Sequence, residues 1–461
     1  MKGRGMGRLD CFKSYDVRGR LGVDLDAGVA RRIGRGFAAA LAPGLVVTGR
    51  DVRQSSPELQ SALIEGLRAG GVDVVDIGLC GTEEVYFATD HFGAGGGIMV
   101  TASHNPIDYN GMKLVGPGAT PLSAEAGLGA VRAAAEADDP GPADRAGAVR
   151  REDPRDAFVA RCLSFVDPGR LRPLKILVNA GNGAAGPTFD AIAAALEARG
   201  APLVFERMWH DPDSTFPNGI PNPLLAENQP PTAEAVRAAG ADFGVAFDGD
   251  FDRCFFFDET GAFVPGEYVV GLLAGAALAR EAGAKIVHDP RVVLNTRAVI
   301  AEAGGKAVVS RTGHAHLKAK MREVDAAYGG EMSAHHYFRD FMYCDSGMIP
   351  WLLVAEHVSR TGRSLGDLVA GARAAFPSSG EINFRLGDAE AARAAFEARY
   401  ASRAREVDRL DGLSLTFEGW RANLRASNTE PVLRLNVEAE GDAALVAEKV
   451  AEIRALLEAE G

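Results

Sequence analysis

Short apolar runs that end in glycine or aspartate alternate along this chain with alanine-rich stretches of helical periodicity. The runs at 44–48, 72–77 and 97–100 predict buried strands. Between the first two, a stretch that begins at Ser56 and Pro57 repeats leucine at helical spacing, and proline is favoured in the first turn of a helix. This alternation of strand and helix is typical of a largely parallel α/β protein.

The same alternation continues beyond a stretch rich in proline, aspartate and glycine at 137–142, which indicates a domain boundary. After Gly380 the pattern changes to strands of alternating apolar and polar residues, followed by a closing helix at 443–460. We therefore expect three related mixed α/β sheet domains and a C-terminal α+β cap domain, with the bounds 1–148, 149–254, 255–372 and 373–461. The third domain is expected to begin at the apolar run 255–257. Within the domains we expect a helix at 155–166 and strands at 174–178, 242–247, 285–288, 307–309, 381–386, 413–417 and 431–438.

With 461 residues, the chain is too long for a single hydrophobic core, which again favours several domains. Its net charge of −12 disfavours nucleic acid or an anionic membrane as a partner, so a phosphate ligand must be held by a local cluster of cations. The five cysteines are scattered without metal-binding spacing, and no apolar run is long enough to span a bilayer. Because the first residues lead into no apolar run, we expect no secretory signal. We expect a cytoplasmic monomer or dimer.

The segment Thr101–Pro106 places a serine hydroxyl beside a histidine, directly after an expected strand. Open α/β sheets build their sites at the carboxyl ends of their strands. A serine needs a base or a cation to become nucleophilic, and His104 lies next to Ser103. The same residue types are also typical of a capping turn, so the hexapeptide alone does not decide between the two interpretations.

Three acids, Asp248, Asp250 and Asp252, follow the expected strand at 242–247 at every second position. Carboxylate oxygens are ligands that Mg²⁺ prefers, and the glycine after the first acid allows a tight turn. Arg253 comes next and can pair with one of the acids or with a phosphate. We expect this loop to be exposed. Two alternatives remain: an acidic turn without a metal, and an aspartyl phosphotransferase in which an aspartate is itself the nucleophile.

Two later segments carry groups suited to a phosphorylated sugar. Glu331 and Ser333 can form hydrogen bonds to neighbouring sugar hydroxyls, although a surface cap uses the same residue types. Further on, a guanidinium, two hydroxyls and an amide lie within five residues, which is enough to hold a phosphate, although such residues also form ordinary turns. These residues are Arg425, Ser427, Asn428 and Thr429, and Arg434 is a weaker candidate on the strand that follows.

In this order and spacing, the four segments resemble the motifs of the α-D-phosphohexomutases, and specifically the bacterial phosphomannomutase/phosphoglucomutase branch. The resemblance implies a four-domain fold in which Ser103 is the phosphoserine and, with the three aspartates, a ligand of Mg²⁺. It implies that Glu331 and Ser333 bind the 3- and 4-hydroxyls of the sugar. It also implies that the loop at 425–429 holds the phosphate that is not being transferred.

Further matches cover most of the chain. The segment at 12–19 resembles the opening of the family, and Gly49–Ser56 resembles a second signature, for which we expect an architectural role. Arg291 stands where the family pattern has lysine, so a forked guanidinium replaces a point charge. Positions that the resemblance assigns to the cleft or to proton transfer are occupied by Tyr15, Arg18, Lys113, His314 and His335.

The resemblance implies an isomerase that interconverts mannose 6-phosphate and mannose 1-phosphate through the phosphoserine and a 1,6-bisphosphate intermediate, with use of glucose phosphates as well. A glucose or mannose 1,6-bisphosphate would act as activator by rephosphorylating the serine, and the product would supply nucleotide-mannose for glycan synthesis. Two alternatives stay open. One is a phosphoglucomutase or phosphoglucosamine mutase, and the other is a non-catalytic phosphosugar-binding protein, against which the intact Ser103 and aspartates argue.

Overall fold

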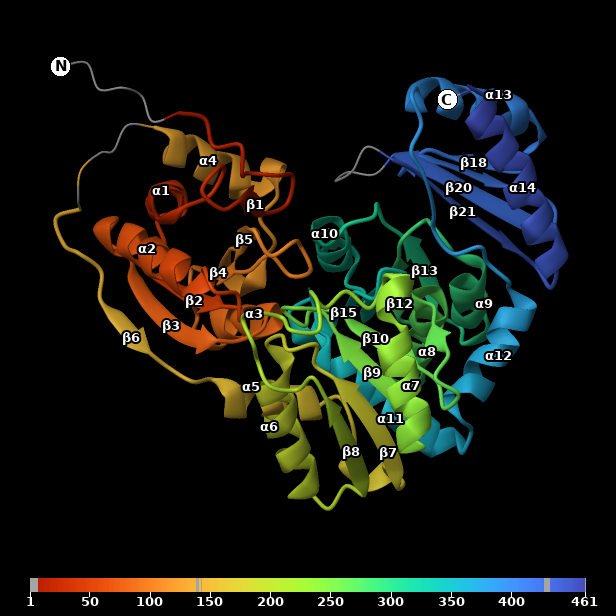
Figure 1. Cartoon of the computed structure of the whole chain (residues 1–461), viewed down its shortest axis with the longest axis horizontal. Coiled ribbons are helices and arrows are strands. Elements are labelled where there is room, and N and C mark those ends of the chain that lie inside the picture. The colour runs from red at the N-terminus through yellow and green to blue at the C-terminus, as the bar shows by residue number, and fades with distance from the viewer. Residues whose placement is uncertain (1–6, 138–140, 142, 427–431, 461) are drawn as a thin grey trace. The chain divides into compact units, whose positions relative to one another are not determined.

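The computed structural model describes residues 7–137, 141, 143–426 and 432–460 of the chain (Figure 1). The chain forms two compact units. The first unit comprises residues 1–263 and 337–362, and the second comprises residues 264–336 and 363–461.

The first sheet has six strands in the order β1-β5-β4-β2-β3-β6. In chain order the strands are Val17–Arg20, Leu45–Arg50, Asp73–Leu79, Gly96–Val100, Tyr109–Val115 and Val149–Arg151. Strands β6, β3, β2 and β4 run parallel, and β5 and β1 continue the sheet with antiparallel pairing. The expected strands at 44–48, 72–77 and 97–100 are therefore confirmed to within a few residues.

Helices cover both faces of this sheet (Figure 1). On one face α1 (Ala27–Leu41) packs against α2 (Ser56–Ala69) and α4 (Gly129–Glu136), and on the other α3 (Thr82–His91) packs against β2 and β4. Successive side chains of a strand point to opposite faces. Val46 accordingly joins the core formed with α1 and α2, whereas Val47 joins a separate cluster with α3. Burial on both faces explains the uninterrupted apolar runs of the sequence.

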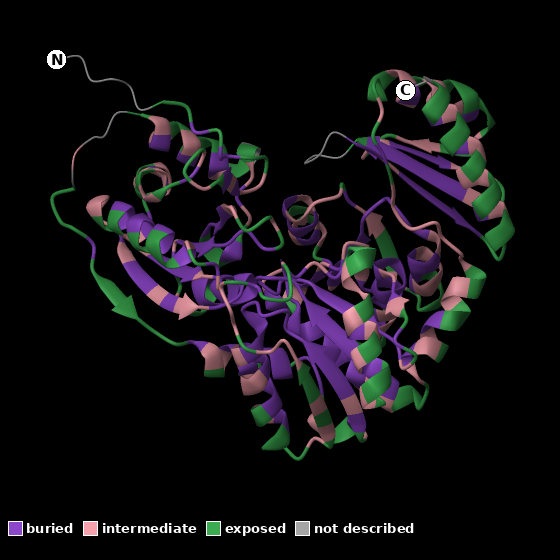
Figure 2. Ribbon diagram, in the orientation of Figure 1, coloured by how far each residue is buried: buried purple, intermediate pink, exposed green. Residues whose placement is uncertain are grey.

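The second sheet has five strands in the order β11-β10-β9-β7-β8. In chain order they are Leu174–Asn179, Leu203–Met208, Phe243–Phe247, Cys254–Phe257 and Phe263–Val264, and the helices of this region are α5 (Arg155–Leu163), α6 (Ala185–Glu197) and α7 (Pro230–Ala239). The strands β7, β9 and β10 are mostly buried, whereas the edge strand β8 has no buried residue and α7 presents an exposed outer side (Figure 2). The expected start of the third domain at 255–257 is wrong, because β10 pairs antiparallel with β9 and belongs to the second sheet.

A segment from much later in the chain completes the first unit. It comprises residues 337–362, which contain most of β15 (His336–Phe338), its antiparallel partner β16 (Cys344–Asp345) and α11 (Met348–Thr361). The buried Trp351 of α11 contacts the ring of Phe189 with 5.2 Å between ring centroids. At the start of α11 the main-chain N–H groups of Gly347 and Met348 donate to Glu83 Oε1 over 3.2 and 3.1 Å. Glu83 therefore fastens the amino end of α11 to α3.

We expect Glu83→Gln to make the protein less sensitive to alkaline pH. Burial raises the pKa of Glu83 well above 4.5, and the bonds from Ser346 and Met348 offset this only in part. The folded state therefore binds the proton more tightly than the unfolded state, so stability falls as the pH rises from about 4.5 through the raised pKa. Glutamine keeps an acceptor oxygen and cannot ionise.

The measurement is calorimetric Tm at pH 5.5 and pH 8.5, with Glu58→Gln, an exposed change on α2, as the control. The Tm of Glu83→Gln minus the Tm of the parent should be larger at pH 8.5 than at pH 5.5. An equal offset at both pH values would show that Glu83 does not carry this dependence.

The second unit starts with the parallel strands of the third sheet, in which β12 lies between β13 and β14. The strands β12, β13 and β14 span Lys285–His288, Lys306–Val309 and Tyr328–Gly330, and the helices α8, α9, α10 and α12 span Gly266–Arg280, Leu294–Glu302, His314–Val324 and Leu365–Ala375. The complete order of this mixed sheet is β13-β12-β14-β15-β16. The strands expected at 285–288 and 307–309 are confirmed.

The C-terminal sheet is antiparallel throughout, in the order β17-β21-β20-β19-β18. In chain order its strands are Ile382–Phe384, Glu406–Asp408, Leu413–Thr416, Trp420–Ala426 and Leu433–Ala439, and the helices α13 (Ala389–Tyr400) and α14 (Ala443–Glu460) pack on one face (Figure 1). Three mixed α/β sheets and this antiparallel α+β domain confirm the expected fold class. Among the helices that the structure describes, none combines the length and apolarity needed to cross a membrane.

Candidate active site

Ser103 lies in the loop between β4 and β5, three residues beyond the end of β4. Its φ of 47° falls in the left-handed region, which is strained for a residue other than glycine and has to be maintained by the surroundings. The acidic loop passes directly beside the serine: a Cβ atom at position 249 would lie 2.6 Å from the Ser103 carbonyl oxygen. Gly249 is therefore required because the two loops approach so closely.

The Ser103 hydroxyl is surrounded by groups that can activate it. Its Oγ donates to Asp248 Oδ2 over 2.7 Å and lies 3.0 Å from His104 Nδ1. Arg253 donates to Asp248 Oδ2 over 2.6 Å and reaches Ser103 Oγ at 3.5 Å. The hydroxyl thus has a carboxylate that can accept its proton and a guanidinium that can balance charge on a phosphoryl group.

His104 is exposed on one side, while its Nδ1 faces Ser103 and the Arg253 guanidinium. Packing of the ring against these neighbours and the positive charge of Arg253 lower the pKa of His104 well below its usual value of 6.5. The imidazole is therefore neutral at physiological pH. A neutral ring nitrogen can accept a hydrogen bond from the serine or from a group bound next to it.

Asp248, Asp250 and Asp252 offer carboxylate oxygens that lie within 4.8 Å of one another. The expectation of an exposed loop is wrong, because all three side chains are buried. The acidic loop follows β9, an inner strand of the second sheet, and packs against the serine loop at Gly249. This packing excludes solvent from the three acids. Three buried acids are stable only with compensating cations.

Lys113 supplies the nearest of these cations. Its Nζ lies 2.7 Å from Asp250 Oδ2 and also donates to Asp252, while Thr82 Oγ1 donates to Asp250 Oδ2 over 2.6 Å. Burial would raise the pKa of Asp250, but the Lys113 charge and these bonds outweigh it and hold the pKa well below the usual range. Burial would likewise lower the pKa of Lys113, and the charges of Asp250 and Asp252 instead raise it. Asp250 is therefore ionised and Lys113 is protonated.

The acidic cluster fits a hard divalent cation. The buried Asp250 Oδ1 has no hydrogen-bond partner among the described residues, and a buried carboxylate oxygen without a partner is costly. Three carboxylates from one loop provide the oxygen donors that Mg²⁺ favours when phosphate oxygen and water complete its shell.

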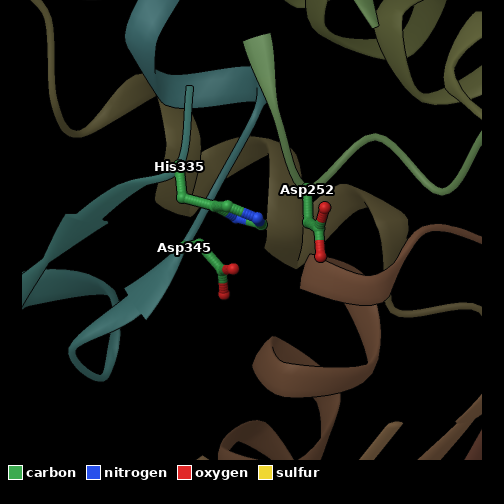
Figure 3. Close-up of side chains that lie close together, drawn as sticks. All are labelled: Asp252, His335 and Asp345. Carbon is green, nitrogen blue, oxygen red and sulfur yellow. The ribbon is translucent and has the colours of Figure 1, made fainter. Parts of the chain in front are cut away.

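Asp345 is a further buried acid in the first unit, to which the sequence analysis gave no role. It ends β16 and offers a carboxylate oxygen within 4.8 Å of one from Asp252 (Figure 3). Only the fold could bring it there, because more than ninety residues separate the two positions along the chain.

Arg18, from the start of the chain, reaches the same region. Arg18, on β1, donates to Asn105 Oδ1 in the serine loop over 2.8 Å and pairs with Asp16 over 2.8 Å. Tyr15 lies half-buried just before β1. The first unit thus brings together eight of the residues singled out from the sequence as catalytic or metal-binding, namely Arg18, Ser103, His104, Lys113, Asp248, Asp250, Asp252 and Arg253.

In the second unit, Arg291 lies at the centre of a polar cluster. Its Nη2 lies 2.7 Å from Asp289 Oδ2, 3.3 Å from Ser333 Oγ and 3.7 Å from Glu331 Oε1. Glu331 Oε1 also accepts from the main-chain N–H of Gly313 over 2.9 Å. The predicted sugar-binding pair therefore lies beside Arg291, which keeps the charge of the expected lysine and adds a second donor direction.

The two candidate histidines of this unit both flank Glu331. His314 is the first residue of α10 and directly follows Gly313. The His335 carbonyl accepts the main-chain N–H of Glu331 over 2.9 Å. Both side chains are half-buried.

Arginines from the C-terminal sheet meet the same cluster. Arg425 and Arg434 are partners across β20 and β21, and their guanidiniums lie 3.2 Å from the carboxylate of Glu381. Arg291 lies 3.5 Å from that carboxylate. At least these three arginines share the Glu381 carboxylate, which can accept a charge-assisted hydrogen bond from each of them. Ser427, Asn428 and Thr429, the other predicted phosphate ligands, lie outside the described residues.

The alternating pattern of β20 places Arg425 in this cluster. Ala422 and Leu424 pack on the helices of the C-terminal domain, whereas Arg421 and Arg425 point to the other face. There Arg421 donates to the carbonyl oxygens of Pro290 and Arg291, and Glu438 accepts the main-chain N–H groups at the start of α9. No role was assigned from the sequence to Glu381, Arg421 or Glu438. Their only sign in the sequence is a charged residue within a strand of alternating apolar and polar positions.

Four models of the phosphoglucomutase/phosphomannomutase family match the chain in order. The models of its α/β/α domains I, II and III match residues 10–139, 156–261 and 265–376, and the model of its C-terminal domain matches residues 381–456. The domain II match ends at residue 261 and the domain III match begins at residue 265. β10 therefore falls within the domain II match, in agreement with its place in the second sheet.

Full-length relatives carry related names. A phosphomannomutase of Salmonella montevideo is 58% identical over 98% of this chain and 100% of its own length. A phosphomannomutase of Escherichia coli K12 is 54% identical with the same coverage, and a Xanthomonas campestris protein named for phosphohexose mutases is 56% identical over 97% of this chain and 99% of its own. A solved family member from Burkholderia thailandensis superposes with a TM-score of 0.85 at 34% identity, covering 98% of this chain and 97% of that one.

Proposed function

The chain belongs to the phosphoglucomutase/phosphomannomutase family, as its motifs indicated, and we propose that it interconverts mannose 6-phosphate and mannose 1-phosphate. The observation that carries the proposal is the hydrogen bond from Ser103 Oγ to Asp248 Oδ2, with Arg253 beside both. Phosphorylated Ser103 transfers its phosphoryl group to the free sugar hydroxyl and forms a 1,6-bisphosphate. The bisphosphate turns round and returns its other phosphoryl group to Ser103.

Asp248, Asp250 and Asp252, with the oxygen of Ser103, would hold Mg²⁺, which when bound neutralises part of the charge on the phosphoryl oxygens. The Asp248 carboxylate accepts the serine proton when Ser103 is rephosphorylated. Arg253 donates towards the same oxygen and balances its charge, and the neutral His104 accepts a hydrogen bond at that position.

Lys113 is the candidate in the first unit for stabilising the reacting sugar oxygen. Its raised pKa keeps it protonated, so it supplies a positive charge and a hydrogen bond to that oxygen rather than exchanging a proton at neutral pH. Arg18 holds its charge next to the serine loop and serves as an electrostatic partner. His314 and His335, which flank Glu331, are the remaining candidates for the general acid and base.

Glu331 and Ser333 bind neighbouring hydroxyls of the sugar, with Arg291 holding both side chains in place. Arg425 and Arg434, with Ser427, Asn428 and Thr429, hold the phosphate that is not reacting. The Glu381 carboxylate pairs with the arginines when no phosphate is bound. This division explains how one end of the sugar reacts while the other end is held.

We expect Arg425→Ala to raise KM for mannose 6-phosphate and mannose 1-phosphate alike. The change removes a charge-assisted bond to phosphate worth on the order of 1.5–3 kcal/mol, so KM should rise roughly tenfold to a hundredfold. More of the 1,6-bisphosphate should escape before it has turned round. Steady-state kinetics in both directions and trapping of released bisphosphate measure the two effects.

The control for this change is Arg409→Ala, which removes one exposed arginine from the same domain. Its KM should match that of the parent. Unchanged KM and no added release of bisphosphate in Arg425→Ala would mean that the idle phosphate is held elsewhere.

Use of glucose phosphates is a second candidate activity, favoured by the family models that combine both sugars and by the relative named for phosphohexose mutases. A glucose or mannose 1,6-bisphosphate would activate the enzyme by restoring the phosphate on Ser103. The product, mannose 1-phosphate, would be the substrate of a nucleotidyl transfer that makes nucleotide-mannose. The enzyme would act in the cytoplasm as a monomer or dimer. Coupled assays on both sugar phosphates, with and without bisphosphate, test these proposals. A lack of turnover with mannose 6-phosphate would contradict the proposed phosphomannomutase activity.

A further inference from the structure

Arg53 lies in the segment Gly49–Ser56, for which the sequence predicted an architectural role. Its side chain is only 1% exposed, yet its guanidinium lies beneath the serine loop. It donates to the main-chain carbonyl oxygens of Ser103 over 2.9 Å and of Asn105, and to those of Pro106 and Tyr109 over 2.9 and 3.1 Å. One charged side chain thus bonds four peptide groups within seven residues of the loop.

The position of Arg53 is itself fixed. Its main-chain N–H donates to Asp51 Oδ1 over 3.0 Å, and its Nε lies 3.6 Å from Asp51 Oδ2. Ser56 Oγ donates to the same carboxylate, and the ring of Phe216 covers the guanidinium at 5.8 Å. Taking a guanidinium out of water is costly, so this arrangement persists only because the loop carbonyls and Asp51 together compensate it.

The bonded carbonyls include the one at the strained point of the loop. Ser103 has a φ of 47°, and a left-handed residue other than glycine needs external restraint. Thr101 Oγ1 accepts its N–H over 2.8 Å and Arg53 binds its carbonyl, so both peptide groups of the serine are held. Carbonyl oxygens bonded to Arg53 also cannot turn towards a phosphoryl group, whose negative charge they would repel.

We propose that Arg53 is a positioning residue for phosphoryl transfer, which sets the Ser103 main chain so that Oγ meets Asp248 and the incoming sugar oxygen. The inference rests on the proposed role of Ser103. A small displacement of a reacting group can cost about a hundredfold in rate while leaving ground-state binding largely intact. Arg53 should therefore influence kcat far more than KM.

The test is Arg53→Lys, with Arg31→Lys, an exposed change on α1, as the control. Lysine keeps the charge but cannot bond four carbonyls with a planar fork. We expect kcat to fall about tenfold to a hundredfold, with KM within about threefold of the parent and kcat of the control unchanged. The phosphorus NMR signal of the phosphoserine should also shift or broaden in Arg53→Lys only.

Arg53→Gln provides a second variant in case lysine is not accommodated. If Arg53→Lys folds and keeps kcat within twofold, or if its apparent kcat falls only in proportion to a loss of folded protein, the positioning role is wrong. It is equally wrong if neither variant folds, since Arg53 would then be purely structural. A parent enzyme that turns over without phosphate on Ser103 would instead defeat the proposed function, so the two failures are distinct.

Discussion

Replacing Ser103 with alanine is expected to lower kcat by several powers of ten, because the change removes the atom that carries the phosphoryl group. Alanine leaves the carbonyl that Arg53 binds and the close approach of Gly249 in place, so the loop should keep its structure. Steady-state turnover of mannose 6-phosphate, together with Tm, measures the effect.

The control is Ser61→Ala, which removes an exposed serine hydroxyl from α2 in the same domain. Its activity should equal that of the parent. A near-normal rate in Ser103→Ala would favour the aspartyl alternative, in which one of the buried acids is the nucleophile and the serine only lines the site.

Asp250→Asn is expected to abolish turnover at ordinary Mg²⁺, because it removes one negative charge from the proposed metal site and the partner of Lys113. Breaking a buried ion pair completely costs about 3–5 kcal/mol, but Lys113 also donates to Asp252 and so keeps one acid. We expect a lower Tm and a native circular dichroism spectrum. Calorimetric titration with Mg²⁺ should show weaker binding than in the parent.

The matched control is Asp144→Asn, an exposed change in the first domain. It should leave both Mg²⁺ binding and turnover as in the parent. If Asp250→Asn were active at ordinary Mg²⁺, the acidic loop would be a buried turn stabilised by Lys113 rather than a metal site.

The sequence predicted those features that depend on local pattern. Apolar runs such as 44–48 and 97–100 became strands because residues buried on both faces leave a continuous signal. The same signal misled at 255–257, because an antiparallel strand that continues a sheet and the first strand of a new sheet look alike when both are buried. The alternating pattern after Gly380 did identify the C-terminal domain.

The composition of the site was predictable where motifs carried it, but its electrostatics were not. Asp248 to Asp252 were recognised, whereas their burial depends on packing beneath a loop from another sheet. The ion pairs of Lys113 with Asp250 and of Arg425 with Glu381 join positions 137 and 44 residues apart. The contact of Arg53 with the serine loop could not be predicted, because its acceptors are main-chain carbonyl oxygens, which every residue has.

The central claim, that Ser103 is the phosphoryl donor, is tested most directly by mapping the phosphate in an active preparation. The enzyme is charged with a hexose 1,6-bisphosphate, freed of ligand and digested before and after mannose 6-phosphate is added. Our account predicts phosphate on Ser103 alone, lost to the sugar within one turnover. Phosphate found on an aspartate, recognised by its lability to hydroxylamine, or a Ser103 phosphate that the sugar does not remove, would contradict it.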